Sequence, residues 1–410
     1  MTPSPPTRPV TAVLFVTDNP GRVGSIRDAA TGPWDVLVAA DRVGALQRLE
    51  ADPVDVIMVD VDPSGDGARL LADVRLRHPD LIRLAVLGGG GRRGVPTAAM
   101  AAHRLLSPDD DPAVAAAAVD DAARLAAELE PEQVRAELTG LDTLLAPPGT
   151  VQRLLALIES PRAGAGDVAN VLAGNAGLAA KVLQVANSSF YAPRTRTVSL
   201  DAAVARLGLE TIRSLALMDG FARRLAGRDP VLGRWLAAFN DHAGETARLA
   251  QRLADPGRRA DAFCAGLLHE CGQLVFASCR PVVFSAHLRL QDGRPALCGE
   301  IEPETFGVSH ARAGAYLLGL WGFPLDVVAA AAAHDAPLGG LDPRSVPGAV
   351  VLAHQLVEAE RVRSCSPPGA PVSPDPATDR PPLMAEIWAW RAEQAATGFA
   401  HHPPNLLVPA

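Results

Sequence analysis

Five short, strand-like apolar runs separated by amphipathic stretches occupy the first 130 residues of the chain, and strand-like runs disappear after them. The runs are Val10–Val16, Trp34–Ala40, Val54–Val59, Leu81–Leu87 and a weaker one at His103–Ser107. Continuous apolar strands that alternate with helices are typical of a parallel sheet covered on both faces. The first 130 residues are therefore predicted to form a five-stranded, doubly wound α/β domain.

Helical periodicity, interrupted by glycine and proline, dominates the chain from residue 112 to about residue 363. One such stretch is Arg259–Ser278, and another begins after Ser309, a suitable N-cap, and ends before Pro324. Only 4% of all residues are aromatic, and text rich in alanine and leucine favours helix over sheet. This part is predicted to be an all-α domain with a self-contained core that folds without the first domain.

The composition changes again after residue 365. Residues 366–382 are rich in proline and are expected to form a linker without regular structure. The predicted division is a first domain at residues 8–130, a helical domain at 138–340 with a helical extension at 341–365, the linker at 366–382 and a C-terminal tail at 383–410.

Charge and cysteine usage exclude several classes of protein. The formal net charge is −8, whereas a general nucleic-acid binder presents a basic face. Met1–Pro9 lacks the apolar stretch of a secretory signal, and the longest apolar runs, such as Val327–Ala333, are far shorter than the roughly 18 residues of a membrane span. The five cysteines form no CxxC pair. We therefore expect a cytoplasmic protein with reduced thiols that does not contact a membrane.

Two acidic residues directly follow predicted strands. Asp18 comes after the first strand and Asp60 after the third. In doubly wound folds the functional site lies at the carboxyl ends of the strands, so the fold should bring these two side chains together. Clustered carboxylates in such a place can hold Mg²⁺, and one of them can accept a phosphoryl group.

The segments VLFVTDNP and VDVIMVDVDPSGDGARLL resemble the receiver domain of bacterial response regulators, which has a flavodoxin-like α/β fold. The resemblance covers about residues 8–130. It implies that Asp60 matches the phosphoacceptor and that Asp18 belongs to the acidic pocket that binds Mg²⁺.

The chain departs from the receiver pattern at three positions. Thr17 stands where the family has a second acid, Leu87 where it has a serine or threonine, and Ser107 where it has a lysine. The lysine pairs with the phosphoryl oxygens, and the hydroxyl donates to a phosphoryl oxygen the hydrogen bond that drives the switch. Without both groups a phosphoryl group would be poorly held and poorly sensed, so we expect a degenerate receiver.

Three segments of the helical part resemble the HDOD domain over about residues 138–340. They are the stretch from VQRLLALIES to LGLETIRSLAL, then AFCAGLLHECGQLVFA, and then FGVSHARAGAYLLGLWGFPLDVVAAAAAHDAP. HDOD domains are all-α relatives of the HD phosphohydrolases, occur in bacterial signalling proteins, often behind receivers, and are thought to have lost the metal-binding residues. The resemblance implies a signalling protein without catalytic residues and without a cofactor.

The HD relatives bind one or two metal ions through a histidine, a His-Asp pair and a distant aspartate, and the metal activates a water molecule. In this chain the pair reads His-Glu and the distant aspartate reads histidine. Because metal sites tolerate only about 0.2 Å of error in ligand distance, we expect a vestigial HD site that holds no metal. Its residues are His242, His269, Glu270, His310, His334 and His354.

Three functions are compatible with the sequence. The first is a non-catalytic scaffold of two-component or phosphorelay signalling, which binds a histidine kinase, a diguanylate cyclase or phosphodiesterase, or a second copy of the chain. The second is a metal-dependent phosphodiesterase of cyclic dinucleotides. The third is a DNA-binding regulator that uses Leu200–Leu217. Because Arg206 and Arg213 are the only cations in that segment, nucleic acid is not the expected partner.

Overall fold

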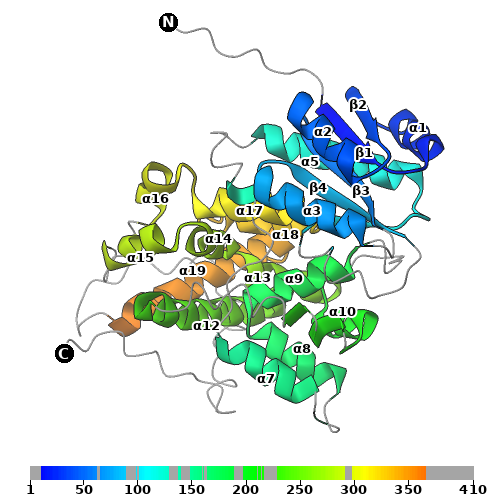
Figure 1. Ribbon diagram of the computed structural model, residues 1–410. Helices are drawn as coiled ribbons and strands as arrows, with labels where there is room; N and C mark the ends of the chain where they lie inside the picture. Colours follow the sequence, from blue (N-terminus) through cyan, green and yellow to red (C-terminus); the bar gives the residue numbers. More distant parts are fainter. Residues whose placement is uncertain are drawn as a thin grey trace, which may run out of the picture.

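The structure is a computed structural model, and it describes residues 11–61, 65–88, 98, 101–128, 137–139, 148–158, 160, 164–188, 197–209, 211–213, 215–216, 229–290 and 298–365. The predicted linker and C-terminal tail lie outside the described residues, as do most of residues 189–228. Figure 1 shows a sheet with its covering helices at the N-terminal end of the chain and a larger body of helices after it.

The N-terminal half is a five-stranded parallel sheet, as the apolar runs predict. Its strands are β1 (Thr11–Val16), β2 (Trp34–Ala39), β3 (Val56–Val61), β4 (Ile82–Leu87) and β5 (Arg104–Leu106), in the order β2-β1-β3-β4-β5. This is the strand order of flavodoxin-like folds. All six residues of β4 are buried, which explains why its sequence is continuously apolar apart from Arg83.

Helices cover both faces of this sheet. They are α1 (Pro20–Asp28), α2 (Arg42–Ala51), α3 (Asp66–Arg77) and α5 (Pro112–Glu128). The α1 helix contacts α5, and α2 contacts α3, so each pair lies on one face of the sheet. Local sequence begins the helices: Asn19 caps α1 just before Pro20, and the side chain of Asp41 accepts a hydrogen bond from the backbone N–H of Gly44 in α2.

The described part of the second half is helical, as predicted. Its elements are α7 (Pro148–Ile158), α8 (Ala165–Ala173), α9 (Ala176–Ala186), α10 (Leu200–Leu207), α12 (Pro230–Leu253), the 3₁₀ turn Pro256–Arg258, α13 (Arg259–Leu268), α14 (Cys271–Cys279), α15 (Pro281–Leu290), α16 (Cys298–Phe306), α17 (His310–Leu320), α18 (Leu325–Ala333) and α19 (Val346–Cys365). The helices α12, α13 and α19 pack on one another at its centre. Ser309 caps α17, as expected from the sequence.

One expectation about the helices is wrong. The periodic stretch Arg259–Ser278 is not a single helix, because α13 ends at Leu268 and α14 begins at Cys271. The turn between them consists of His269 and Glu270. Residues Pro256–Cys279, which include the preceding 3₁₀ turn, are long and apolar enough to cross a membrane by length and composition alone. However, 72% of the 18-residue apolar window within this range is buried inside the protein. Its apolar side chains thus belong to the core.

One cluster of buried apolar side chains extends through both halves of the described chain, and independent folding of the helical half stays a prediction. At their junction the guanidinium group of Arg104 in β5 donates to the carbonyl groups of Gly319 and Leu320, at 2.9 and 3.0 Å. The Gln184 side chain of α9 donates to the carbonyl of His103 at 2.7 Å. Both donors are bound to backbone groups across the junction, which fixes the helical half against strand β5.

The segment 137–139 lies between the two halves and is bound to both. The side chain of Arg83 is fully buried, and it donates to the carbonyl groups of Leu81, Ala101 and Thr139. The Thr139 hydroxyl shares a hydrogen bond of 2.9 Å with the Tyr316 hydroxyl of α17. A buried arginine is tolerated here because backbone oxygens satisfy its donors.

The junction contains the only lysine of the chain, Lys181, which is 3% exposed and lies 5.6 Å from the centre of the Trp321 ring. We predict that an amine-reactive ester labels the N-terminal amino group far faster than Lys181 in the folded protein, because the reagent cannot reach a buried amine. In Arg104→Ala, which removes two hydrogen bonds across the junction, Lys181 labelling should accelerate. Peptide mass spectrometry measures both rates. Rapid labelling of Lys181 in the unaltered protein would contradict a closed junction.

Candidate metal centre

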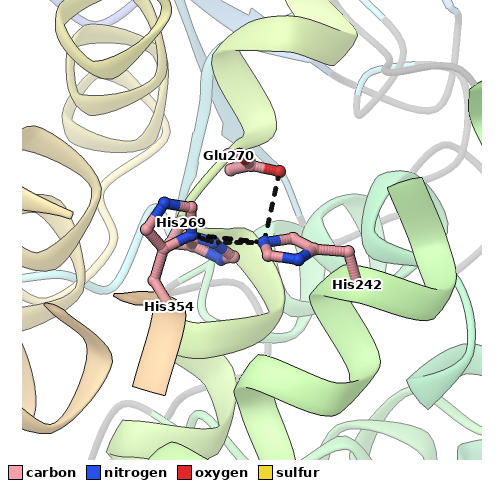
Figure 2. Close-up of side chains that lie close together, drawn as sticks. All are labelled: His242, His269, Glu270 and His354. Atoms are coloured by element: carbon pink, nitrogen blue, oxygen red, sulfur yellow. Dashed lines mark hydrogen bonds and ion pairs between the residues drawn. The ribbon is translucent and has the colours of Figure 1, made fainter. Parts of the chain in front are cut away.

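The six residues of the predicted vestigial HD site lie together in the structure, although 112 residues separate the first from the last. They come from three helices, from the residue directly after a fourth, and from one turn. His242 lies within α12, His269 and Glu270 form the turn between α13 and α14, His310 begins α17, His334 directly follows α18 and His354 lies within α19. Figure 2 shows His242, His269 and His354 pointing toward one another, with Glu270 above them.

Three ring nitrogens of this cluster form a nearly equilateral triangle. His242 Nε2 lies 3.2 Å from His269 Nε2 and 3.2 Å from His354 Nδ1, and the latter two nitrogens are 3.1 Å apart. The Glu270 carboxylate lies 3.6 Å from His242 Nε2. All three rings are buried.

The outer nitrogen of each ring faces an acceptor. His269 Nδ1 donates to the carbonyl of Gly266 at 2.7 Å. His354 Nε2 lies 3.5 Å from a carboxylate oxygen of Asp335, and His242 Nδ1 lies 3.4 Å from one of Glu358. With protons on these outer nitrogens, the three inner nitrogens present lone pairs to one point, and only a cation or shared protons can satisfy them.

A second pair of histidines repeats this arrangement beside the first group. His310 Nε2 and His334 Nε2 are 2.9 Å apart, while their Nδ1 atoms face the Glu302 carboxylate at 2.7 Å and the Ala331 carbonyl at 2.9 Å. An Asp335 oxygen lies 3.2 Å from His310 Nε2. One ligand atom each from Glu270, His310 and His334 lies within 4.8 Å of the other two, so Glu270 belongs to both groups.

The pKa values of the histidines diverge within the cluster. Burial, together with the neighbouring histidines, holds the pKa of His269 well below its usual value, and it lowers the pKa of His334 to about 3. Burial also opposes protonation of His310, but hydrogen bonds to Asp335 and Glu302 raise its pKa to about 10. The pKa of His354 is raised against burial by Asp335. The carboxylates beside His310 and His354 thus favour the protonated form of these two rings, whereas His269 and His334 favour the neutral form.

The triangle of nitrogens has the size that a metal ion needs. Two imidazole nitrogens that bind one metal ion at about 2.1 Å lie roughly 3 to 3.4 Å apart at the angles of tetrahedral or octahedral coordination. The observed separations of 3.1 to 3.2 Å fall in this range. Histidine nitrogens with a carboxylate suit zinc, iron or manganese. The residues present therefore fit a divalent transition metal.

Sequence reasoning found the six central residues but missed the groups that orient them. Glu358 follows His354 by one helical turn, and that spacing could have identified it. Asp335 adjoins His334 in the sequence, and this adjacency could have identified it. Glu302 carries no local signal, because it lies on α16 and reaches His310 only through the turn between α16 and α17.

The predicted receiver site is occupied by the chain's own side chains. One oxygen of Asp60 accepts a hydrogen bond from the Thr17 hydroxyl at 2.5 Å, and the other lies 3.2 Å from an Arg22 nitrogen. The same guanidinium group donates to the Ser107 carbonyl at 3.4 Å, at the position where receivers have their lysine. Burial raises the pKa of Asp60, and Asp18 is exposed beside it. The resemblance to receiver domains did not identify Arg22 as the charge partner of Asp60.

We predict that acetyl phosphate labels Asp60 slowly or not at all. Both carboxylate oxygens are already bound, and a phosphoryl group would have to displace the pair with Arg22. Intact-protein mass spectrometry after incubation with Mg²⁺ and acetyl phosphate measures the labelling. Rapid, stoichiometric labelling that disappears in Asp60→Asn would show that the acceptor remains functional.

Comparison with known proteins supports the resemblance of the helical half to the HDOD domain. The HDOD domain model matches residues 144–337, which include all of the cluster except His354. An uncharacterized protein of Treponema pallidum (strain Nichols) is 27% identical over 183 residues, which are 44% of this chain and 35% of that protein. The chain thus aligns with about a third of the length of this curated relative.

Two solved structures of low similarity are described as a response regulator and as an HDOD domain protein. The MmoQ response regulator of Methylococcus capsulatus is 24% identical, with a TM-score of 0.47, over 60% of this chain and 93% of that chain. An HDOD domain protein of unknown function from Geobacter sulfurreducens is 22% identical, with a TM-score of 0.36, over 68% of this chain and 97% of that chain. The family match, and the helices and histidines it spans, lead to the conclusion that residues 144–337 of this chain form an HDOD domain.

Proposed function

We propose that this chain is a signalling protein whose HDOD domain binds a divalent transition metal and serves as a docking module for other signalling proteins. The observation that carries the proposal is the triangle of three buried histidine nitrogens, 3.1 to 3.2 Å apart. It replaces our expectation from the sequence that this site holds no metal.

The metal part of the proposal rests on how the rings are oriented. Imidazole ligands of metals generally donate their other N–H group to a carboxylate or a carbonyl. In the triangle, His269 makes such a hydrogen bond, and a carboxylate oxygen lies within 3.5 Å of the outer nitrogens of His242 and His354. A cluster used only for packing has no need of lone pairs that converge on one point. The substitution of glutamate for aspartate at Glu270 is compatible with this role, because the three nitrogens already provide the ligands of one ion.

Docking, rather than catalysis, is favoured by the charges around the cluster. The ion pairs described at the cluster join histidines to carboxylates of Glu270, Glu302, Asp335 and Glu358. A phosphodiester is an anion, and such a carboxylate-rich surrounding repels it unless the bound metal offsets the charge. The proposed partners are a histidine kinase or an enzyme of cyclic-dinucleotide metabolism, with the receiver-like half as a fixed part of the module.

Metal-dependent phosphoester hydrolysis is the second candidate, and one observation favours it. The Asp335 side chain is 47% exposed although it contacts His310 and His354, so solvent reaches the edge of the cluster. A divalent ion lowers the pKa of a bound water and makes it a nucleophile at neutral pH. Asp335 and Glu270 would then orient that water.

Two assays on the same metal-loaded protein separate the candidates. The first measures hydrolysis of bis(p-nitrophenyl) phosphate and of cyclic dinucleotides, with His269→Ala as the blank. The second compares the proteins that copurify with the metal-loaded and the metal-stripped chain. We expect no turnover above the His269→Ala blank and a metal-dependent set of signalling proteins. Turnover that requires His269 would establish the hydrolase instead.

A further inference from the structure

A carboxylate deep in the helical half is hydrogen-bonded to one histidine of the cluster. The Glu302 side chain on α16 is 2% exposed. A single one of its oxygens accepts two hydrogen bonds from His310, one from the backbone N–H at 2.8 Å and one from ring Nδ1 at 2.7 Å. Backbone and ring of His310 are therefore held by the same atom.

This double contact fixes which ring nitrogen of His310 faces the cluster. With Nδ1 donating to Glu302, Nε2 points to His334 Nε2 at 2.9 Å and to an Asp335 oxygen at 3.2 Å. His269 and His334 have their outer nitrogens on neutral backbone carbonyls instead. A carboxylate behind an imidazole makes its other nitrogen a stronger electron donor than a carbonyl does.

Helix capping alone does not account for Glu302. The N-terminus of α17 already has a cap, because the Ser309 hydroxyl accepts a hydrogen bond from the N–H of Arg312. Burying a carboxylate is costly unless strong donors face it, and exposed positions for an acid are available nearby on the same helix, as Glu304 shows. Among the described residues, His287 also lies close enough to interact with Glu302, and its ring stands edge-on to Phe306.

We infer that Glu302 is the positioning residue of His310, which fixes the ring so that Nε2 is presented to a metal ion shared with His334 and Glu270. This inference rests on the proposed metal-binding function. It extends that function by assigning the second histidine pair a ligand role and by placing the orienting group on a separate helix.

Two substitutions of Glu302 separate charge from geometry. Glu302→Gln keeps an oxygen that can accept both hydrogen bonds but removes the charge, whereas Glu302→Ala removes both. Groups that orient metal ligands typically contribute 10- to 100-fold to metal affinity. In a Co²⁺ titration followed by absorption, we expect about 10-fold weaker binding for the glutamine variant and about 100-fold weaker binding for the alanine variant. Glu304→Gln, an exposed change on the same helix, should bind like the unaltered protein.

A second measurement does not depend on metal. In metal-free protein labelled with ¹⁵N-histidine, the ring nitrogen shifts of His310 should change in both Glu302 variants and not in Glu304→Gln. Unchanged His310 ring shifts, or unaltered Co²⁺ affinity in Glu302→Ala, would overturn the inference. If instead the unaltered protein binds no Co²⁺ while the ring shifts change as expected, the metal function fails and the positioning of His310 by Glu302 stands.

Discussion

Replacing Gly272 by alanine should destabilise the protein severely. A Cβ atom at this position would lie 1.8 Å from the backbone oxygen of His310 and 2.9 Å from the backbone nitrogen of Gly314. Backbone atoms of a helix cannot move aside as the end of a side chain can, so α14 and α17 would have to separate. We expect a loss of about 3 kcal/mol or more in the free energy of unfolding, measured by urea denaturation followed by far-UV circular dichroism.

Gly233→Ala is the matched control for this prediction. Gly233 lies exposed within α12, and nothing lies within 4 Å of a Cβ atom built there. Alanine is the better helix former, so this variant should gain up to about 1 kcal/mol. Because Gly272 contacts the residue that begins α17, Gly272→Ala should also weaken metal binding through His310. Unaltered stability of Gly272→Ala would mean that α14 and α17 do not pack as closely as described.

Replacing His269 by alanine should nearly abolish metal binding. His269 supplies one corner of the nitrogen triangle, and its ring also lies 5.0 Å from those of His334 and His354, centre to centre. Removing a group that merely orients a ligand costs 10- to 100-fold in affinity, so loss of a ligand should cost more than about 100-fold. Equilibrium dialysis against Zn²⁺ with metal analysis measures this.

The same substitution should lower stability even without metal. It leaves the Gly266 carbonyl without the hydrogen bond that His269 donates, and an unsatisfied buried polar group costs about 1–3 kcal/mol. His78→Ala, a change in the N-terminal half far from the cluster in sequence, controls for nonspecific metal binding by histidine. Zn²⁺ affinity in His269→Ala equal to that of the unaltered protein would remove His269 from the set of ligands.

The architecture of both halves could be predicted from local sequence because it follows from periodicity. Buried parallel strands read as continuous apolar runs, and the observed strands, including the short β5, begin and end within two residues of those runs. The break between α13 and α14 could not be predicted in this way. Apolar residues continue through it, and the close approach of Gly272 to α17 beside this turn is a tertiary contact that local periodicity does not encode.

The six central residues of the candidate metal centre were predicted from the sequence, whereas the metal binding proposed for them was not. The resemblance to HD proteins located the six central side chains, and the changes at Glu270 and His354 suggested that the site is lost. The structure shows that His354 presents a nitrogen to the same point as His242 and His269. Arg22, Glu302 and the junction between the halves escaped prediction because they are tertiary contacts between segments with no shared pattern.

The most direct test of the account is a Co²⁺ titration of the metal-stripped, full-length protein. Co²⁺ in a site of histidine nitrogens and carboxylates absorbs visible light, and the band is more intense when the coordination number is low. One titration therefore measures both the binding of the ion and its coordination number. We predict saturable binding of at least one equivalent per chain, with a visible absorption band that is lost in the His242→Ala, His269→Ala and His354→Ala variants. Failure of the unaltered protein to retain Co²⁺ through gel filtration, or an unchanged band in all three variants, would contradict the proposed metal centre.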